Sequence, residues 1–140
     1  MASLSFPDIN VWLALTSPEH PHTRKLSWWN RESGDIAFCR QSQLGFLRLT
    51  TTAMVMSGKP LTMAEAWSVY DRFYEDGRVR FVQEPGAVER LFRERTSGST
   101  ASPKMWSDAW LLATATAADG RLVTFDAALG QRGAHCLSAT

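Results

Sequence analysis

The sequence is poor in the residues on which several classes of protein depend. Its two cysteines, Cys39 and Cys136, are too few for a disulfide framework and form no Cys-x-x-Cys pair, so we expect reduced thiols. His20 and His22 flank a proline and have no third zinc ligand beside them. The chain also lacks a glycine-rich phosphate loop and a serine–histidine–aspartate arrangement. A disulfide scaffold, a zinc site and a serine nucleophile are therefore not expected.

Long hydrophobic runs and an excess of one charge are absent as well. No apolar run approaches the roughly 20 residues that a membrane-spanning helix needs. The first residues also lack the basic and apolar regions of a signal peptide. We therefore expect a cytoplasmic protein with no membrane partner. The formal net charge is +1, so a nucleic acid would have to be held by local positive charge or by a metal.

What the sequence does contain is the composition of one folded domain, which we expect to span residues 1–140. It is 44% hydrophobic and 21% charged, and it is long enough to bury a core. Apolar segments of strand and helix type alternate along it. The predicted strands are 3–6, 35–39, 78–82, 121–125 and 135–137, and the predicted helices are 10–15, 22–30, 42–49, 62–73, 85–95 and 104–118. This alternation predicts an α/β fold with a parallel sheet covered on both faces.

Two helix starts carry a local signal. Thr62 is followed three residues later by Glu65, which is the pattern of a capping box. Ser42 precedes an apolar helical stripe and is the expected N-cap of its helix.

Three aspartates form the chemical signal of this chain. Asp8 and Asp126 each come directly after a predicted strand, and ligands of such folds collect at the carboxyl ends of the strands. Asp108 lies on a helix face shared with Leu111 and Leu112, so its carboxylate points toward the protein body. A carboxylate in that position is costly to desolvate unless it is paired or coordinated.

A divalent cation would remove the repulsion between these carboxylates. Hard oxygen ligands suit Mg²⁺ or Mn²⁺. The amide of Gln43 is expected to face inward near the same cleft. Other interpretations remain for each acid: Asp8 and Asp126 would also serve as helix caps, and Asp108 would also interact with a helix N-terminus.

At these residues the chain resembles the PIN-domain nucleases, and specifically the VapC toxins of bacterial toxin–antitoxin systems. The matching segments occur in family order across nearly the whole chain: Pro7–Leu15, Gln43–Leu49, Trp106–Ala113 and Leu122–Asp126. The resemblance implies a three-layer α/β/α sandwich with a central parallel sheet. It also implies a Mg²⁺- or Mn²⁺-dependent endoribonuclease, a homodimer, and neutralisation by a cognate VapB-type antitoxin.

The resemblance also assigns roles to individual residues. Asp8, Asp108 and Asp126 fall on the metal-site acids of the family, and Asn10 falls on the polar residue that supports the first of them. The hydroxyl residues beside the site, expected to contact substrate, are Ser107 and Thr124.

The chain departs from the family at Gln43, where many members carry a glutamate. An amide adds no negative charge, so we expect one well-bound metal, with any second ion recruited by the RNA phosphate. Glu84 would replace the missing acid only if the third strand delivered it to the same cleft.

The mechanism expected from these residues is in-line attack of a metal-activated water on a phosphodiester, which leaves 5′-phosphate and 3′-hydroxyl ends. Arg48 is the expected phosphate contact, and the substrate would be a tRNA or an rRNA. Arg93, Arg95 and Lys104 flank a Ser/Thr-rich loop, where they would either grip RNA or form a solvated basic helix end. The alternative function is a catalytically weak PIN-like module that binds RNA or protein.

Overall fold

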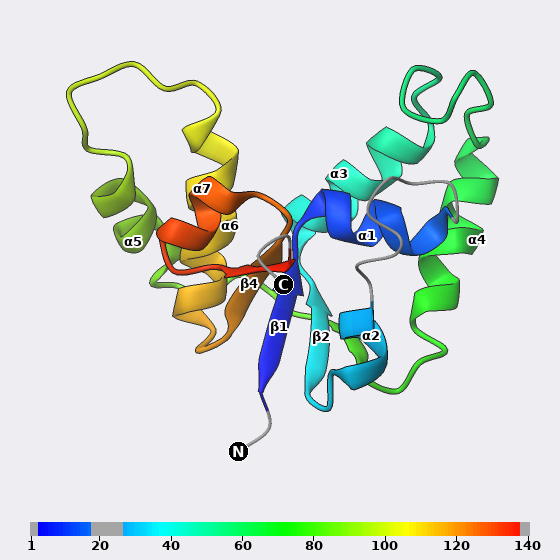
Figure 1. The fold of residues 1–140 in the computed structure, drawn as a ribbon, viewed down its shortest axis with the longest axis horizontal. Helices are drawn as coiled ribbons and strands as arrows, with labels where there is room; N and C mark the ends of the chain where they lie inside the picture. The colour runs from blue at the N-terminus through cyan, green and yellow to red at the C-terminus, as the bar shows by residue number, and fades with distance from the viewer. Residues whose placement is uncertain (1–2, 18–26, 138–140) are drawn as a thin grey trace.

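The computed structural model describes residues 3–17 and 27–137. Their centre is a five-stranded sheet of order β3-β2-β1-β4-β5, in which every neighbouring pair is parallel (Figure 1). The strands are β1 (Leu4–Pro7), β2 (Asp35–Phe38), β3 (Val79–Phe81), β4 (Arg121–Thr124) and β5 (His135–Cys136). The order reverses at β1, so the chain enters the middle of the sheet and builds outward in both directions.

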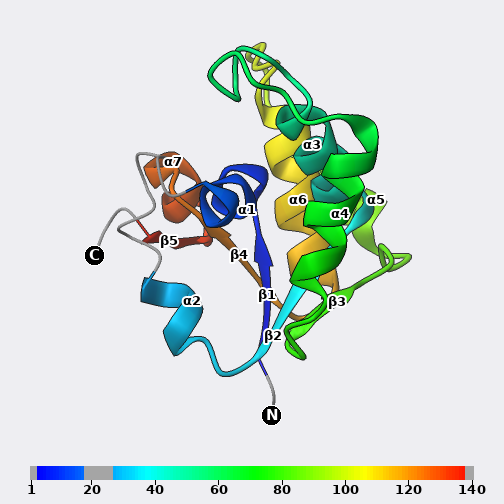
Figure 2. The ribbon, with the colours of Figure 1, turned by 90° about the vertical axis from the view of Figure 1, so that its right-hand side faces the viewer.

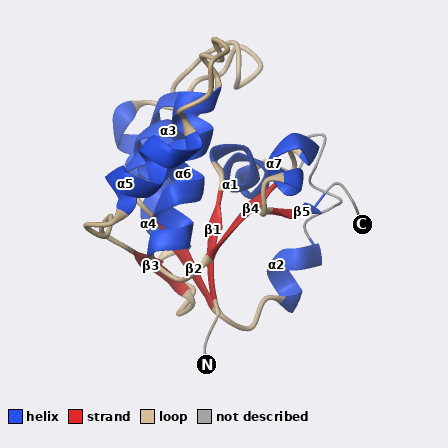
Figure 3. Ribbon diagram, turned by 90° about the vertical axis from the view of Figure 1, so that its left-hand side faces the viewer, coloured by secondary structure: helices blue, strands red, loops and turns tan. Residues whose placement is uncertain are grey.

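Helices cover both faces of this sheet. The helices are α1 (Ile9–Thr16), α2 (Ser27–Arg31), α3 (Arg40–Thr50), α4 (Met63–Phe73), α5 (Val88–Arg95), α6 (Met105–Ala117) and α7 (Ala127–Gln131). Figures 2 and 3 show α3, α4, α5 and α6 on one side and α1, α2 and α7 on the other. The predicted three-layer α/β/α sandwich with a central parallel sheet is confirmed.

The predicted elements in the described residues agree with the structure except at some boundaries, but the short helix α7 was not among the predicted helices. The capping box is present, because Thr62 Oγ1 accepts from the Glu65 N–H at 3.1 Å and Glu65 Oε1 accepts from the Thr62 N–H at 2.8 Å. The prediction that Ser42 is an N-cap is wrong. Cys39 is extended and is the N-cap of α3, and the Ser42 hydroxyl, at the third helical position, accepts from the Cys39 N–H at 3.0 Å. Most of the helix predicted at 22–30, with His20 and His22 before it, lies outside the described residues.

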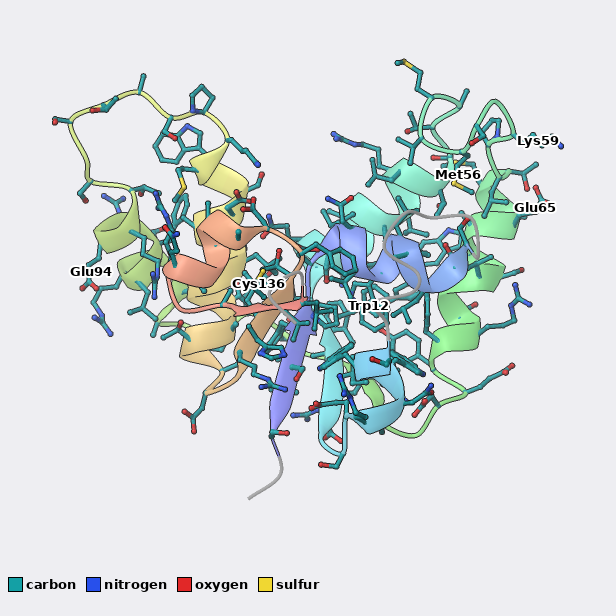
Figure 4. All side chains as sticks on the ribbon, in the orientation of Figure 1. Trp12, Met56, Lys59, Glu65, Glu94 and Cys136 are labelled. Atoms are coloured by element: carbon teal, nitrogen blue, oxygen red, sulfur yellow. The ribbon has the colours of Figure 1, made fainter. Side chains whose placement is uncertain are left out.

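The apolar core between α1 and the sheet is built around Trp12. Its ring is fully buried and stacks on Phe38 of β2, with centroids 3.8 Å apart and planes 10° apart (Figure 4). Phe73 of α4 contacts the same indole ring edge-on, at 4.9 Å. Because parallel strands are buried on both faces, this packing needs continuous apolar strands such as Ile36–Phe38. No helix in the described part of the chain is long and apolar enough to cross a bilayer.

An ion pair with one buried partner, Glu32, lies at the amino-terminal end of the sheet, opposite to the end where the aspartates lie. The Glu32 side chain is 6% exposed, and its carboxylate accepts hydrogen bonds from Ser5 at 3.1 Å and from Ser3 at 3.3 Å. Arg121 of β4 pairs with it at 3.2 Å. Removing one partner of such a pair leaves a buried charge uncompensated.

We expect Arg121→Met to lower the free energy of unfolding by about 1–2 kcal/mol, because the buried Glu32 carboxylate loses its counter-ion while the arginine itself is partly exposed. Urea denaturation measures this change. The matched control is Arg80→Met, which removes an arginine paired with Asp35 where both side chains are about half exposed; its effect should stay under about 1 kcal/mol. Equal effects of the two substitutions would show that the Glu32 pair contributes no more than a surface pair.

Candidate functional site

Asp8 follows β1 directly and is the N-cap of α1. Its Oδ1 accepts a hydrogen bond from the Val11 N–H at 3.1 Å. The backbone N–H of Asn10 also stabilises its charge, so the support expected from Asn10 comes from its main chain, while its side chain is exposed. Asp8 Oδ2 accepts from the Thr124 hydroxyl. Capping therefore uses one oxygen of Asp8 and leaves the other facing the end of β4.

Asp126 is placed in the same way at the end of β4, where it caps α7. Its Oδ1 accepts from the Ala128 N–H at 2.8 Å and from the Leu129 N–H at 3.4 Å. Its Oδ2 lies 3.3 Å from the Lys104 ammonium. Both strand-end aspartates thus serve as helix caps and still present a second oxygen at the carboxyl edge of the sheet.

Thr124 joins the two acid-bearing turns. Its hydroxyl donates to Asp8 Oδ2 and accepts from the Asp126 N–H at 3.0 Å. The side chain is fully buried. The expectation that Thr124 contacts substrate is therefore corrected, because a hydroxyl with no exposed surface and two partners holds the acids in position.

Asp108 approaches from the first turn of α6, and it is partly buried. Leu111, Leu112 and Ala115, on the same helix face, are buried against the sheet. This arrangement confirms that Asp108 lies on the inward side of α6. Ser107 beside it is exposed and remains a candidate substrate contact.

Burial and mutual repulsion oppose ionisation of two of the three acids. Burial raises the pKa of Asp8, and the charge of Asp108 adds to the increase, against the hydrogen bonds from Thr124 and Val11. Burial also raises the pKa of Asp108, with a further increase from Asp126, against the charges of Lys104 and Arg132. The acids therefore form an electrostatically coupled set, in which Asp108 interacts both with Asp8 and with Asp126.

Asp126 behaves differently because it has its own counter-ion. Burial opposes its charge, but the Ala128 N–H and the Lys104 ammonium outweigh that effect and lower its pKa. The third carboxylate is thus ionised and paired, whereas Asp8 and Asp108 have no described cation at hydrogen-bond distance.

The chemistry of this donor set suits a divalent cation at Asp8 and Asp108. Both offer hard oxygen ligands, and both have a charge that burial and repulsion penalise. Within residues 3–17 and 27–137, however, no three His, Cys, Asp or Glu side chains are grouped so as to hold a metal ion. The expected cluster of three aspartates is therefore a coupled pair with a third, lysine-paired acid beside it.

The expected fourth side chain, Gln43, is engaged elsewhere. It is buried as predicted, but its Oε1 accepts from Arg40 and its Nε2 donates to the Tyr70 hydroxyl at 3.3 Å. Its amide therefore faces α4 rather than the acids. Glu84 does not replace it, because Glu84 is exposed beyond β3, the outermost strand on that side of the sheet.

Gln41 is the α3 side chain that sequence reasoning missed. Its Nε2 donates to the Ser107 carbonyl at 2.8 Å, and its Oε1 is buried without a hydrogen-bond partner. A Cβ on Gly45, one turn later, would come within 2.1 Å of Ile9 Cδ1. Arg48 continues this stripe at a spacing of seven residues. Gln41, Gly45 and Arg48 are spaced by four and three residues, so they lie on one face of α3. This spacing could have indicated that their face meets α1 and α6, and that the face of Gln43 does not.

The basic residues near the Ser/Thr-rich loop divide into two groups. Arg93 pairs with Glu89 at 3.3 Å and Lys104 pairs with Asp126. Arg95 lines a cleft beside that loop and has no ion-pair partner in the described part of the chain. Neither Arg48 nor Arg95 is neutralised by a described carboxylate, so both remain available for an anion.

The chain was compared with known protein families and with solved structures. Residues 5–134 match the PIN domain family. The chain belongs to the PIN-domain family. This PIN-domain chain is 38% identical over 133 residues to a Mycobacterium tuberculosis protein named ribonuclease VapC41, which covers 90% of this chain and 91% of the relative. It is 32% identical over 126 residues to ribonuclease VapC44 of the same species, which covers 85% of this chain and 83% of the relative. The resemblance to VapC proteins is confirmed.

Two solved structures share the fold at low sequence identity. One is the VapBC2 complex of Rickettsia felis bound to a DNA fragment from its promoter, with a TM-score of 0.61, 13% identity and coverage of 91% of this chain and 92% of that chain. The other is Mycobacterium tuberculosis VapC20, a sarcin–ricin loop cleaving toxin, with a TM-score of 0.63, 14% identity and coverage of 92% and 95%. These structures support the three-layer architecture.

We expect Asp108→Asn to raise the melting temperature of the metal-free protein at pH 7. The folded state binds the Asp108 proton more tightly than the unfolded chain does, so ionisation costs stability as pH rises above the ordinary value of 3.8 and through the raised pKa. The variant avoids that cost, and its advantage should shrink as pH falls toward 4. Thermal unfolding in EDTA at several pH values measures the difference. An unchanged or lower melting temperature at pH 7 would contradict this account of the site.

Proposed function

We propose that this chain is an endoribonuclease that acts as the toxin of a toxin–antitoxin pair. The observation that carries the proposal is the set of coupled carboxylates at the carboxyl edge of the sheet, joined by the Thr124 hydroxyl. The membership of the chain among VapC proteins, whose M. tuberculosis relatives are named ribonucleases, supports the same function.

Metal dependence is part of this proposal. Asp8 and Asp108 would hold Mg²⁺ or Mn²⁺, and Asp126 offers a further oxygen that Lys104 neutralises. A bound divalent ion would supply Lewis acidity and would lower the pKa of a coordinated water. Hydrolysis at this site is expected to leave 5′-phosphate and 3′-hydroxyl ends.

The residues of the chain itself orient the reacting groups. Thr124 and the N–H of Val11 fix both oxygens of Asp8, so its carboxylate does not need to reorganise when substrate binds. Gln41 ties the first turn of α6 to α3, which keeps Asp108 opposite Asp8. Arg48, on the same stripe of α3 as Gln41, is placed to hold a substrate phosphate.

The partners follow from the family. The Rickettsia felis relative is a complex of VapB and VapC, so we infer that a VapB-type antitoxin neutralises this chain. We also infer a homodimer, which sedimentation analysis tests. The RNA is a tRNA or an rRNA; the M. tuberculosis relative VapC20 cleaves the sarcin–ricin loop, but its 14% identity carries only the fold to this chain.

A second function is favoured by one observation. The described residues contain no group of three metal-binding side chains, and Asp126 is paired with Lys104. A PIN-like module that binds RNA or protein without cleaving it would tolerate such a site. A cleavage assay separates this module from the nuclease.

The test is cleavage of a tRNA pool and of a sarcin–ricin loop oligonucleotide in Mg²⁺ or Mn²⁺. Asp8→Asn should lower cleavage by at least about 100-fold, because it removes a proposed metal ligand, and excess EDTA should do the same. The matched control is Asp119→Asn, an exposed residue at the far end of α6 whose φ of 58° suits asparagine. Its cleavage should equal that of the wild type.

Two outcomes would remove the proposal. Robust cleavage by Asp8→Asn or in excess EDTA would exclude the metal mechanism. Tight RNA binding with no cleavage of either substrate by the wild type would favour the binding module.

A further inference from the structure

The cleft lined by Arg95 lies under the loop that joins α5 to α6. Its volume is about 610 Å³. Figure 1 shows this loop arching away from the sheet at the upper left. No carboxylate is among the residues that line the cleft, and loop residues 98–103 supply several hydroxyl groups. Its side chains of chemical interest are Arg95, Thr96, Ser99, Thr100, Trp106 and Arg132. The cleft is therefore suited to an anionic ligand.

The positive charge of this cleft is not used in holding the fold together. The other arginines of α5 are paired along the helix, Arg90 with Glu94 at 3.2 Å and Arg93 with Glu89 at 3.3 Å. Glu94 points outward from α5, away from the body of the protein (Figure 4). Arg95 and Arg132 have no ion pair with any residue the structure describes. Two guanidinium groups thus remain available on the cleft wall.

An aromatic ring on the same wall is exposed and supported from behind. The Trp106 side chain is 58% exposed, although burial of a ring this large would be favourable. Its indole packs against Phe92 of α5 at 5.9 Å between centroids, and Phe92 packs edge-on against Trp110 at 5.2 Å. An exposed ring supported by Phe92, which is itself packed against Trp110, is a preorganised surface for stacking.

The cleft adjoins the acids of the nuclease site. The connecting loop ends at Lys104, whose ammonium lies 3.3 Å from Asp126 Oδ2. Arg132 also acts electrostatically on Asp108. A chain of phosphates passing Asp8 and Asp108 can therefore continue into the cleft.

We propose that this cleft binds an unpaired nucleotide of the RNA next to the cleaved bond, with Arg95 and Arg132 on the backbone phosphate and Trp106 stacked on the base. The inference rests on the proposed nuclease function and names the form of its substrate. A base can stack on Trp106 only when it is released from a duplex, so the cleft selects single-stranded loops or ends. Two arginines without ion-pair partners and an exposed tryptophan favour a nucleotide over an acidic peptide, which would use the arginines but not the stacking surface.

The experiment measures binding of a fluorescent, unstructured RNA dodecamer to the full chain by anisotropy in EDTA, so that cleavage does not interfere. Arg95→Gln and Arg132→Gln should each weaken binding about tenfold and reduce the slope of log K against log salt by about 0.7. The matched control is Arg93→Gln, which removes the same charge two residues earlier from an arginine already paired with Glu89. It should bind within about twofold of the wild type.

The stacking role has its own pair of variants. Trp106→Ala should weaken binding of the single strand on the order of tenfold, and Trp106→Phe should restore most of the affinity. The affinity for a blunt RNA duplex should change little in either variant. Trp67→Ala removes a tryptophan that is 47% exposed on α4 and serves as the control for lost aromatic surface.

The outcomes separate this inference from the proposed function. RNA binding that is equally sensitive to Arg93 and Arg95 would overturn the subsite, even if the protein cleaves RNA. Unchanged RNA affinity in the cleft variants together with lost binding of a VapB-type antitoxin would assign the cleft to the partner and overturn it too. Tight binding that depends on Arg95 and Trp106 in a protein that cleaves nothing would support the subsite while refuting the nuclease.

Discussion

The hydroxyl of Thr124 connects the parts of this protein on which its chemistry depends. It lies at the end of β4, donates to the Asp8 carboxylate that follows β1, and accepts from the backbone of Asp126. This contact exists only because β1 and β4 are parallel neighbours, which brings the carboxyl ends of both strands to one edge. A buried hydroxyl with two partners holds the Asp8 carboxylate and the backbone of Asp126 in a fixed relation.

Electrostatics then distinguishes the three aspartates. Asp8 and Asp108 carry charges that burial and repulsion penalise, whereas Asp126 is neutralised by Lys104 and by the start of α7. A site with this imbalance attracts a cation more strongly at its buried pair than at its outer acid. The free arginines at the neighbouring cleft extend the positive charge outward from the acids. A polyanion is repelled by the carboxylates of the site, and arginines beside those carboxylates offset this repulsion.

The sequence predicted the fold well because its signals are local. Alternating apolar strands and helices require crossover connections, and crossovers impose parallel pairing and two covered faces. Segments such as Arg121–Thr124 and the capping box at Thr62 could be located from neighbouring residues alone. The errors came where two local signals compete. Cys39 rather than Ser42 is the N-cap of α3, because the strand before it already places Cys39 in the extended conformation that a cap needs.

The site was predicted only in part, and the division has a physical cause. The positions of Asp8 and Asp126 follow from the strand that precedes each of them, and the inward face of Asp108 follows from helical periodicity. Which amide on α3 meets α6, how Lys104 pairs with Asp126 and where Arg95 and Arg132 come together depend on the packing of helices far apart in the chain. Sequence by itself therefore determined the elements and the candidate acids, because those are set within a few residues. Tertiary structure alone decided which side chains form an ion pair, share a hydrogen bond or line the same cleft, because these contacts depend on distance in space.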